Sequence, residues 1–490
     1  MPKAAIVGGG VIGGGWAARF LLMGWDVAVF DPDPESERKI GEVLDNARRA
    51  LPGLVDVRMP SAGRLHHVGN LSACVADADW IQESVPERLD LKLRVYQEIQ
   101  AACPPDAVIG SSTSGFKPSE LQEGAARPEQ ILVTHPFNPV YLLPVVEVVG
   151  SDRTPDAVRD RACEVLRGIG MAPVVIGREI DAHVADRLME AMWREALWLV
   201  HDGVATTAEI DDIIRFGFGL RWAQMGIFET FRVAGGEAGM RHFMAQFGPA
   251  LKWPWTKLMD VPEMDDALID KIAGQSEDQA AGRSVRELER IRDTNLVGIM
   301  RALKWQGWGV GTVLKAQEDR VAAATGAVRR FEDLADLSRP VVTLEMTVPL
   351  DWTDYNGHMT EAKYLQAFGD ATDRFMQVVG CDAAYVAAGG SFFTAESHIR
   401  HLAEAHAGAP LRIETQCLGG EGKKMHLFHR MWSGDMELAT GEHMLIHVDM
   451  ATRRAAPPGP DVARKLGAIA AAHAALPVPE GAGRAVGSPR

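Results

Sequence analysis

Residues 4–31 read AAIVGGGVIGGGWAARFLLMGWDVAVFD. An apolar run leads into glycines and an amphipathic helix, and a second apolar run ends at an aspartate. The glycines have G-x-G-x-x-G spacing, which lets the backbone approach a pyrophosphate at the helix N-terminus. A carboxylate after the second strand binds ribose hydroxyls and disfavours a 2′-phosphate, so NAD is expected rather than NADP. The residues expected at the NAD site are Gly8, Gly9, Gly10, Val11, Ile12, Gly13 and Asp31.

The sequence pattern changes at four points along the chain. Residues 1–180 alternate β-rich runs with amphipathic helices, which is typical of a largely parallel α/β Rossmann domain. Residues 181–325 have apolar residues at helical spacing and predict an all-α domain, followed by a linker at 326–340. A strand, a long helix and four β-rich runs at 341–460 predict an α+β domain. Residues 461–490 are rich in Ala, Pro and Gly and are expected to form a frayed tail.

Size, charge and cysteine usage limit what kind of protein this is. A chain of 490 residues is too long for one core, and its net charge of −15 disfavours nucleic-acid or anionic-membrane surfaces. The 5 cysteines contain no CxxC pair, which argues against a disulfide framework or a metal site. No secretion signal or long apolar run is evident, so we expect a cytoplasmic protein.

A histidine and a glutamate in THPFNPVYLLPVVEVV (residues 134–149) predict a proton-transfer dyad. A carboxylate on one imidazole nitrogen fixes the tautomer and makes the other nitrogen a better base. Oxidation of a secondary alcohol needs such a base, because the hydroxyl proton leaves as hydride goes to the nicotinamide. For His135 alone the alternative is a buried, satisfied histidine, but Glu147 lies only twelve residues further on.

Further motifs occur in the order found in the 3-hydroxyacyl-CoA dehydrogenase superfamily: ESVPERLDLK (83–92), SSTSG (111–115), HPFNPV (135–140) and VVEVV (145–149). The resemblance covers residues 1 to about 320. It implies that His135 is the catalytic base and Glu147 its partner. It also implies that Ser111 and Asn138 hydrogen-bond the substrate hydroxyl or the nicotinamide. Members usually dimerise through the helical domain, so a homodimer is expected.

The same resemblance implies that Glu87 and Lys92 line the cofactor. It also shows two departures from the members that act on acyl-CoA. Those members carry Asn-Arg at the start of the helical domain, where this chain has Asp186-Arg187. Their Gly-Pro-Phe-Glu stretch is here GLRWAQMGIFETF (219–231), which is closer to the branch that oxidises small free hydroxy acids, including gulonate and carnitine.

Aromatic residues of the helical domain suggest how carnitine would be held. A trimethylammonium cannot donate a hydrogen bond, and aromatic faces hold it with about 0.5–2 kcal/mol each, helped by a nearby carboxylate. We expect Trp222 and Phe228 to form a cage, Asp186 to complement the cation and Arg221 to hold the carboxylate. The alternatives are that the aromatics are core residues and that Arg221 serves a structural salt bridge.

A second catalytic motif is LDWTDYNGHMTEAKYLQAF (350–368). With the runs that follow, it resembles the hotdog-fold thioesterases of the 4-hydroxybenzoyl-CoA type. By that resemblance Asp354 attacks the thioester carbonyl or activates water, and helix N-terminal N–H groups stabilise the oxyanion. Asn356 or His358 would orient the water or the carbonyl. The alternative for Asp354 is a helix-capping acid.

A small-acid dehydrogenase followed by a thioesterase resembles bacterial carnitine dehydrogenases that carry a thioesterase domain. This resemblance implies NAD-dependent oxidation of L-carnitine to 3-dehydrocarnitine and hydrolysis of betainyl-CoA to glycine betaine. The alternative is a dehydrogenase for L-gulonate or a 3-hydroxyacyl-CoA, with a hotdog module that serves only binding or dimerisation.

Overall fold

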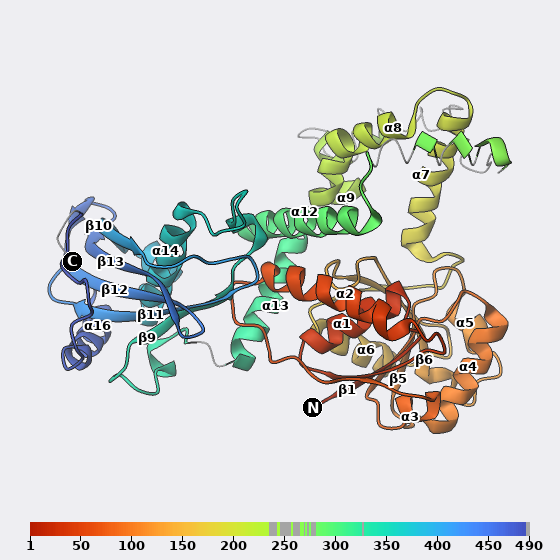
Figure 1. The fold of residues 1–490 in the computed structure, drawn as a ribbon, viewed down its shortest axis with the longest axis horizontal. Coiled ribbons are helices and arrows are strands. Elements are labelled where there is room, and N and C mark those ends of the chain that lie inside the picture. Colours follow the sequence, from red (N-terminus) through yellow and green to blue (C-terminus); the bar gives the residue numbers. More distant parts are fainter. Residues whose placement is uncertain are drawn as a thin grey trace. The chain divides into compact units, whose positions relative to one another are not determined.

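The computed structural model describes residues 1–234, 243–245, 256–257, 265–268, 270–271, 274–275, 281–325 and 328–486. The chain forms two compact units, one from residues 1–47 and 61–317 and the other from residues 48–60 and 318–490. Figure 1 shows a sheet with helices in each unit. None of the helices in the described ranges is long and apolar enough to cross a membrane.

The first unit is built on an eight-stranded sheet in the order β3-β2-β1-β4-β5-β6-β7-β8. The strands are β1 (Lys3–Val7), β2 (Asp26–Phe30), β3 (Leu65–His67), β4 (Trp80–Glu83), β5 (Val108–Ser111), β6 (Ile131–Pro136), β7 (Val145–Val149) and β8 (Ala172–Ile176). The first six run parallel, whereas β7 is antiparallel to β6 and parallel to β8. The predicted α/β class is confirmed, and the reversal at β7 places His135 opposite Glu147.

Helices cover both faces of this sheet (Figure 1). They are α1 (Val11–Leu22), α2 (Ser36–Ala50), α3 (Leu71–Val75), α4 (Leu89–Ala102), α5 (Pro118–Leu121) and α6 (Asp156–Gly168). On one face, Ile81 and Ile109 from the strands pack with Tyr96 and Ile99 of α4 in a fully buried core. Such near-continuous apolar strands are typical of a sheet covered on both sides.

The described elements between β8 and the second unit are helices. The elements are α7 (His183–His201), α8 (Thr207–Ile213), the π-helical turn η3 (Ile214–Phe218), α9 (Gly219–Ala234), α12 (Val285–Gln306) and α13 (Val310–Thr325). Thr206 with Glu209 and Ser284 with Glu287 form capping boxes that start α8 and α12. Gly307, with φ +63°, ends α12 in the left-handed conformation that glycine adopts without strain.

The second unit has the hotdog arrangement of a long helix against an antiparallel sheet, in the order β10-β13-β12-β11-β9. The main elements are β9 (Val341–Thr347), α14 (Glu361–Val378), α15 (Ala383–Ala387), β10 (Gly390–His401), β11 (Pro410–Gly419), β12 (Lys424–Ser433), β13 (Met436–Asp449) and β14 (Arg454–Ala455). Phe368 and Phe375 of α14 are fully buried and join two apolar clusters with side chains of the sheet. The predicted α+β class is confirmed.

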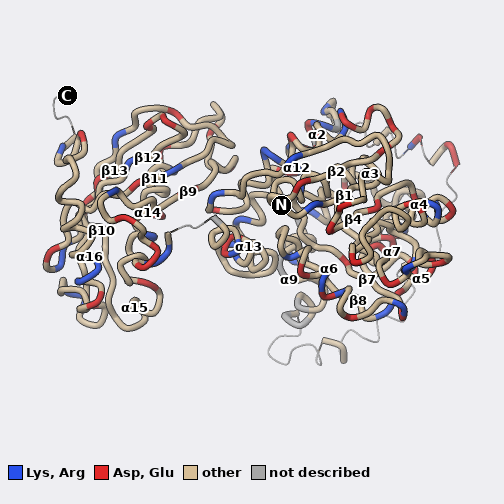
Figure 2. The backbone as a smooth tube through the Cα atoms, turned by 90° about the horizontal axis from the view of Figure 1, so that it is seen from below, with Lys and Arg blue, Asp and Glu red and all other residues tan. Residues whose placement is uncertain are grey.

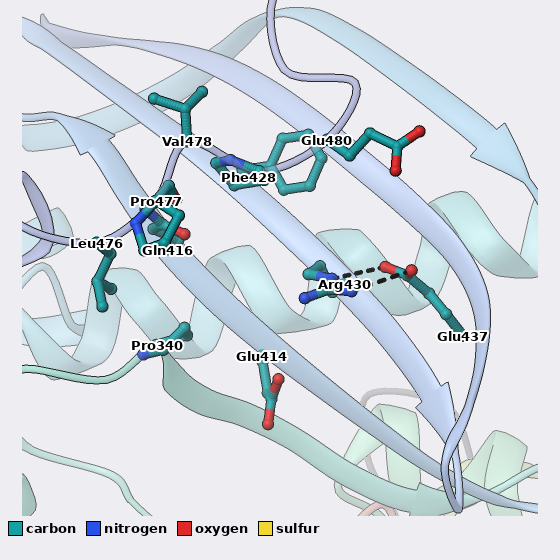
Figure 3. A pocket seen from close by; sticks show the side chains of 11 residues that line it. Pro340, Glu414, Gln416, Phe428, Arg430, Glu437, Leu476, Pro477, Val478 and Glu480 are labelled. Carbon is teal, nitrogen blue, oxygen red and sulfur yellow. Dashed lines mark hydrogen bonds and ion pairs between the residues drawn. The ribbon is translucent and has the colours of Figure 1, made fainter. Parts of the chain in front are cut away.

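The chain after residue 460 differs from the tail that its composition predicts. Residues Pro460–His473 form a helix, α16, and its Val462, Leu466 and Ile469 are buried in the same cluster as Phe375. The apolar residues have helical spacing, which is easily overlooked in an Ala-rich stretch. The segment beyond α16 also contacts the sheet, because Gln416 Nε2 donates to the carbonyl of Pro477 (3.3 Å). Figure 3 shows this segment beside the ion pair of Arg430 and Glu437.

A row of polar side chains crosses the hotdog sheet, with one residue on each of its five main strands. The hydroxyl of Thr343 lies 2.7 Å from that of Thr415, which lies 2.8 Å from His429 Nδ1. The ring of His443 lies 5.1 Å from that of His429, and its Nδ1 lies 2.9 Å from Ser397 Oγ. Because His429 and His443 are buried, protonating either ring is unfavourable.

Acid should therefore destabilise the hotdog unit. Burial lowers the pKa of His443 from its ordinary value of 6.5 to about 4. Between these values the unfolded chain binds a proton that the folded chain does not, so stability falls as pH falls. At about 1.4 kcal/mol per unit the expected loss is about 3 kcal/mol. Amide hydrogen exchange of β12 and β13, corrected for intrinsic rates, should show this loss, and His443→Gln should reduce it where His66→Gln does not. Equal exchange free energies at both ends of this pH range would contradict the account.

Candidate active sites

The turn between β1 and α1 has the geometry that a dinucleotide needs. Gly8 has φ +101°, and a Cβ built there would lie 2.5 Å from the carbonyl oxygen of Ser84. A Cβ on Gly13 would lie 1.8 Å from the carbonyl oxygen of Gly8. Gly10 is the N-cap of α1 and no side chain caps the helix, so its first N–H groups can bind a phosphate. These residues fit NAD.

Asp31, which follows β2, also braces this turn. Its Oδ2 accepts a hydrogen bond from Gly9 N (2.5 Å) and its Oδ1 accepts one from Asp33 N (2.7 Å). Acidic and basic residues are interspersed along α2 (Figure 2). The basic residues near the start of α2 are already paired: Arg38 with Glu35 (2.8 Å) and Glu42 (2.7 Å), and Lys39 with Asp33 (2.6 Å). A carboxylate with paired cations nearby favours NAD over its 2′-phosphorylated form.

The antiparallel pairing of β6 and β7 assembles the predicted dyad. The strand register places His135 directly opposite Glu147, and His135 Nδ1 lies 2.9 Å from Glu147 Oε2. The two residues are 5% and 3% exposed. Glu147 Oε1 accepts hydrogen bonds from Val184 N (3.0 Å) and Ala185 N (3.1 Å) at the start of α7. The helical part of the unit therefore helps to hold the dyad.

Glu147 is a charged carboxylate in this setting. Burial raises the pKa of its carboxyl group, but the hydrogen bond to His135 and the N–H groups of Ala185 and Val184 lower it by more, so the net pKa lies below the ordinary value. A carboxylate at Nδ1 keeps a hydrogen there and leaves Nε2 as the basic nitrogen. It also stabilises the imidazolium that forms when Nε2 takes a proton.

Two side chains approach Nε2 of His135. Ser114 Oγ lies 3.4 Å away and Asp186 Oδ2 lies 3.7 Å away. The structure does not bring the predicted Ser111 to this nitrogen, because its buried hydroxyl donates to Glu83 Oε2 (2.7 Å). The SSTSG motif contains three serines, and sequence spacing does not distinguish which of them faces the histidine.

Glu87 and Lys92 support the serine loop, which we define as residues 111–115. Lys92 is almost fully buried, and its Nζ lies 2.8 Å from Glu83 Oε1 and 3.3 Å from Glu87 Oε2. Glu87 Oε1 accepts hydrogen bonds from the backbone N–H groups of Ser114 (3.1 Å) and Gly115 (2.9 Å). Both residues thus fix the loop that carries the serine at the dyad, a role that the cofactor-lining prediction did not include.

The remaining predicted residues of the dehydrogenase lie elsewhere in the first unit. Asn138 is exposed and lines a cavity with Val11 beside the glycine-rich turn. The ring of Trp222 packs 4.6 Å from that of Phe218 and lines an apolar cavity formed with α7 and α8. Phe228 is 80% exposed. The aromatic ring found near His135 is that of Phe137, with 5.6 Å between the ring centroids.

Arg221 on α9 is exposed, and the described contacts do not place it at the dyad. Of the four residues predicted for the substrate of the dehydrogenase, Asp186 is the one that the described contacts bring to His135. Its side chain is 18% exposed, so it is accessible to a bound molecule.

The second site is the turn before α14. Asp354 Oδ1 accepts hydrogen bonds from the N–H groups of Asn356 (2.8 Å) and His358 (3.3 Å), while Asn356 Nδ2 lies 3.4 Å from Oδ2. Burial raises the pKa of Asp354, but these backbone hydrogen bonds lower it by more, so the group is a carboxylate at neutral pH. Within the described part of the chain, Oδ2 makes just this long contact, so it can face a thioester. Gly357 closes the turn with φ +78°.

Two residues that the sequence motif does not contain complete this cluster. His358 Nε2 lies 3.4 Å from Glu404 Oε2, and the ring of His358 lies 4.7 Å from that of His406. An isolated antiparallel bridge joins His358 to His406. Because these partners lie over 40 residues further along the chain, only the tertiary structure reveals them.

These features define a class: an NAD-dependent dehydrogenase with Rossmann and helical parts, joined to a hotdog thioesterase. Family models agree. Residues 3–180 match the NAD binding domain of 3-hydroxyacyl-CoA dehydrogenase, residues 183–266 its C-terminal domain, and residues 348–466 the thioesterase-like superfamily. The chain belongs to the family of L-carnitine dehydrogenase/betainyl-CoA thioesterases.

Full-length relatives support this assignment to the family. The protein of that name from Ruegeria pomeroyi is 65% identical over 100% of both chains. The one from Agrobacterium fabrum is 57% identical over 99% of this chain and 98% of its own. Among solved structures, the NAD+-dependent 5-formyl-3-hydroxy-2-methylpyridine 4-carboxylic acid 5-dehydrogenase is 25% identical with a TM-score of 0.52. It covers 62% of this chain and 99% of its own.

Proposed function

We propose that this chain oxidises L-carnitine to 3-dehydrocarnitine with NAD and hydrolyses betainyl-CoA to glycine betaine. The oxidation of L-carnitine is supported by the carboxylate of Asp186, which lies beside the basic nitrogen of the His135–Glu147 dyad. Formation of NADH from NAD and L-carnitine by the full chain tests this activity. The second activity is supported by the carboxylate of Asp354 in front of a helix N-terminus of a hotdog unit.

In the oxidation, His135 Nε2 takes the proton of the substrate hydroxyl and Glu147 stabilises the resulting imidazolium. NAD, when bound, accepts the hydride. The Ser114 hydroxyl, 3.4 Å from the same nitrogen, is placed to hydrogen-bond the substrate oxygen. The buried strands around the dyad exclude bulk water from this proton transfer.

The role of Asp186 follows from the charge of the substrate. The trimethylammonium of carnitine lies close to its hydroxyl group, so protonation of His135 creates a second positive charge beside the first. Two such charges about 5 Å apart repel by about 3 kcal/mol at an effective dielectric constant of about 20. A carboxylate at this place offsets that repulsion, whereas the asparagine expected in members that act on acyl-CoA is neutral.

Replacing Asp186 by asparagine should therefore discriminate between charged and neutral substrates. We expect kcat/KM for L-carnitine to fall about 100-fold, which corresponds to about 3 kcal/mol. For the carbon analogue with a tert-butyl group in place of trimethylammonium, we expect a much smaller loss. Glu190→Gln, an exposed carboxylate on the same helix, is the control. Equal losses with both substrates would contradict the role in charge compensation.

For the thioesterase, Asp354 attacks the thioester carbonyl carbon or removes a proton from the attacking water, and the CoA thiol leaves. No side chain caps α14 at Thr360, so the first N–H groups of this helix are available to the oxyanion. His358, held by Glu404, is placed to orient the water.

We also propose that the chain works as a cytoplasmic homodimer. All 5 cysteines are free and buried in the structure, as is usual in a reducing compartment. Exposed apolar side chains on α7, including Leu188, Met189 and Trp193, form a surface suited to a second copy. L-Carnitine, betainyl-CoA and NAD are then its small-molecule partners, and no nucleic-acid or membrane partner is expected.

A further inference from the structure

The connector between β8 and α7 runs antiparallel along the serine loop and the residues that follow it. Four contacts join them in order: Ser119 N to Glu179 Oε2 (2.9 Å), Lys117 Nζ to Asp181 Oδ1 (2.9 Å), Ala182 N to Gly115 O (3.4 Å) and His183 Nε2 to Thr113 O (3.2 Å). The last contact is one residue away from Ser114, whose hydroxyl lies at the catalytic histidine. The connector thus fastens the start of α7 to the loop.

His183, which makes the last of these contacts, is strained and fully buried. It has φ +49° and follows Ala182 with φ +57°, and the left-handed conformation is unfavourable for residues with a Cβ. A carbonyl oxygen can only accept a hydrogen bond, so Nε2 of His183 carries the hydrogen and donates to Thr113. Its Nδ1 is buried without a hydrogen-bond partner in the described structure.

The ring of His183 also lies against the dyad, with its centroid 5.4 Å from that of His135. Burial, and then the neighbouring His135, lower the pKa of His183, so its ring stays neutral beside the base. Because its pKa is lowered, this ring does not compete with His135 for the proton of the substrate, and its N–H is directed at Thr113. What it supplies is a fixed anchor for the loop.

We propose that His183 is a positioning residue of the alcohol-oxidising site: its Nε2–H holds the carbonyl of Thr113 and thereby keeps the hydroxyl of Ser114 at Nε2 of His135. Glu87 holds the same loop through different atoms, the N–H groups of Ser114 and Gly115. The inference rests on the proposed oxidation of L-carnitine, which supplies the assay.

A double-mutant cycle tests the proposal. Ser114→Ala, His183→Phe and the double variant are compared with the wild type for kcat, KM for NAD and the pH dependence of kcat/KM. Each single variant should lower kcat about tenfold, the value of one hydrogen bond at the substrate, and the double variant should be no worse than Ser114→Ala. His183→Gln should recover most of the activity, because its amide can donate to Thr113. His201→Phe, at the other end of α7, is the control.

Several results would overturn this role. Additive losses in the double variant would show that His183 does not act through Ser114. A shifted pH profile in His183→Phe would indicate an effect on the His135–Glu147 dyad instead, as would failure of His183→Gln to recover activity while it still binds NAD. The wild type is measured first with L-carnitine. A missing activity at that step counts against the proposed function, whereas an active wild type with additive variants counts against His183.

Discussion

Replacing His135 by alanine should abolish the oxidation of L-carnitine. The dyad supplies the general base, a contribution worth about 10²–10⁴-fold in rate. Binding of NAD should be unchanged, because the cofactor is expected on the glycine-rich turn and Asp31. Hydrolysis of betainyl-CoA should also be unchanged. Formation of NADH, protein fluorescence on NAD addition and release of CoA thiol measure the three properties.

Two further variants make this experiment decisive. Glu147→Gln keeps the size of the side chain but removes the charge that stabilises the imidazolium, so it should lose much of the same activity. His66→Ala replaces an exposed histidine of β3 and should leave the oxidation intact. If His135→Ala kept the rate of the wild type, the dyad would not be the base. If it lost both activities, the variant would be misfolded and Glu147→Gln would carry the test.

Replacing Asp354 by asparagine should abolish hydrolysis of betainyl-CoA and leave the oxidation of L-carnitine intact. The amide has nearly the shape of the carboxylate, and its oxygen can still accept the N–H groups of Asn356 and His358. It lacks the negative charge needed for attack or for proton abstraction, so we expect a loss of about 10²–10⁴-fold. The release of CoA thiol from betainyl-CoA measures it.

Asp351→Asn is the matched control for this variant, because it changes an exposed carboxylate three residues earlier in the same segment. It should hydrolyse betainyl-CoA at the rate of the wild type. Full hydrolysis by Asp354→Asn would show that Asp354 only closes the turn before α14. The hotdog unit would then use another group for hydrolysis.

The sequence predicts the parts of the sites that depend on local spacing. The glycine-rich turn is predictable because Gly13 lies against the backbone of Gly8, a contact set by a few residues. The dyad is predictable because His135 and Glu147 lie on two strands joined by a short connection. The pairing of these strands places the two residues opposite each other. Both patterns depend on backbone geometry within short stretches of the chain.

The parts of the sites that the sequence does not predict depend on the direction of side chains or on contacts between distant residues. Ser111 and Ser114 belong to one motif, but Ser111 donates to the buried carboxylate of Glu83 whereas Ser114 lies near His135. The helical domain contains enough aromatic residues for a cage, but Trp222 packs on Phe218 of the turn that precedes α9. His406 reaches the turn at Asp354 from a loop beyond β10, which no local pattern indicates.

If the first unit recognises the charge of L-carnitine and transfers its hydroxyl proton to His135, L-carnitine should be its preferred substrate. The most direct test follows NADH formation by the full chain with L-carnitine, D-carnitine, L-gulonate and 3-hydroxybutyryl-CoA in parallel. The account predicts turnover of L-carnitine far above that of the other three. Turnover of L-gulonate or of the CoA ester without turnover of L-carnitine would contradict it.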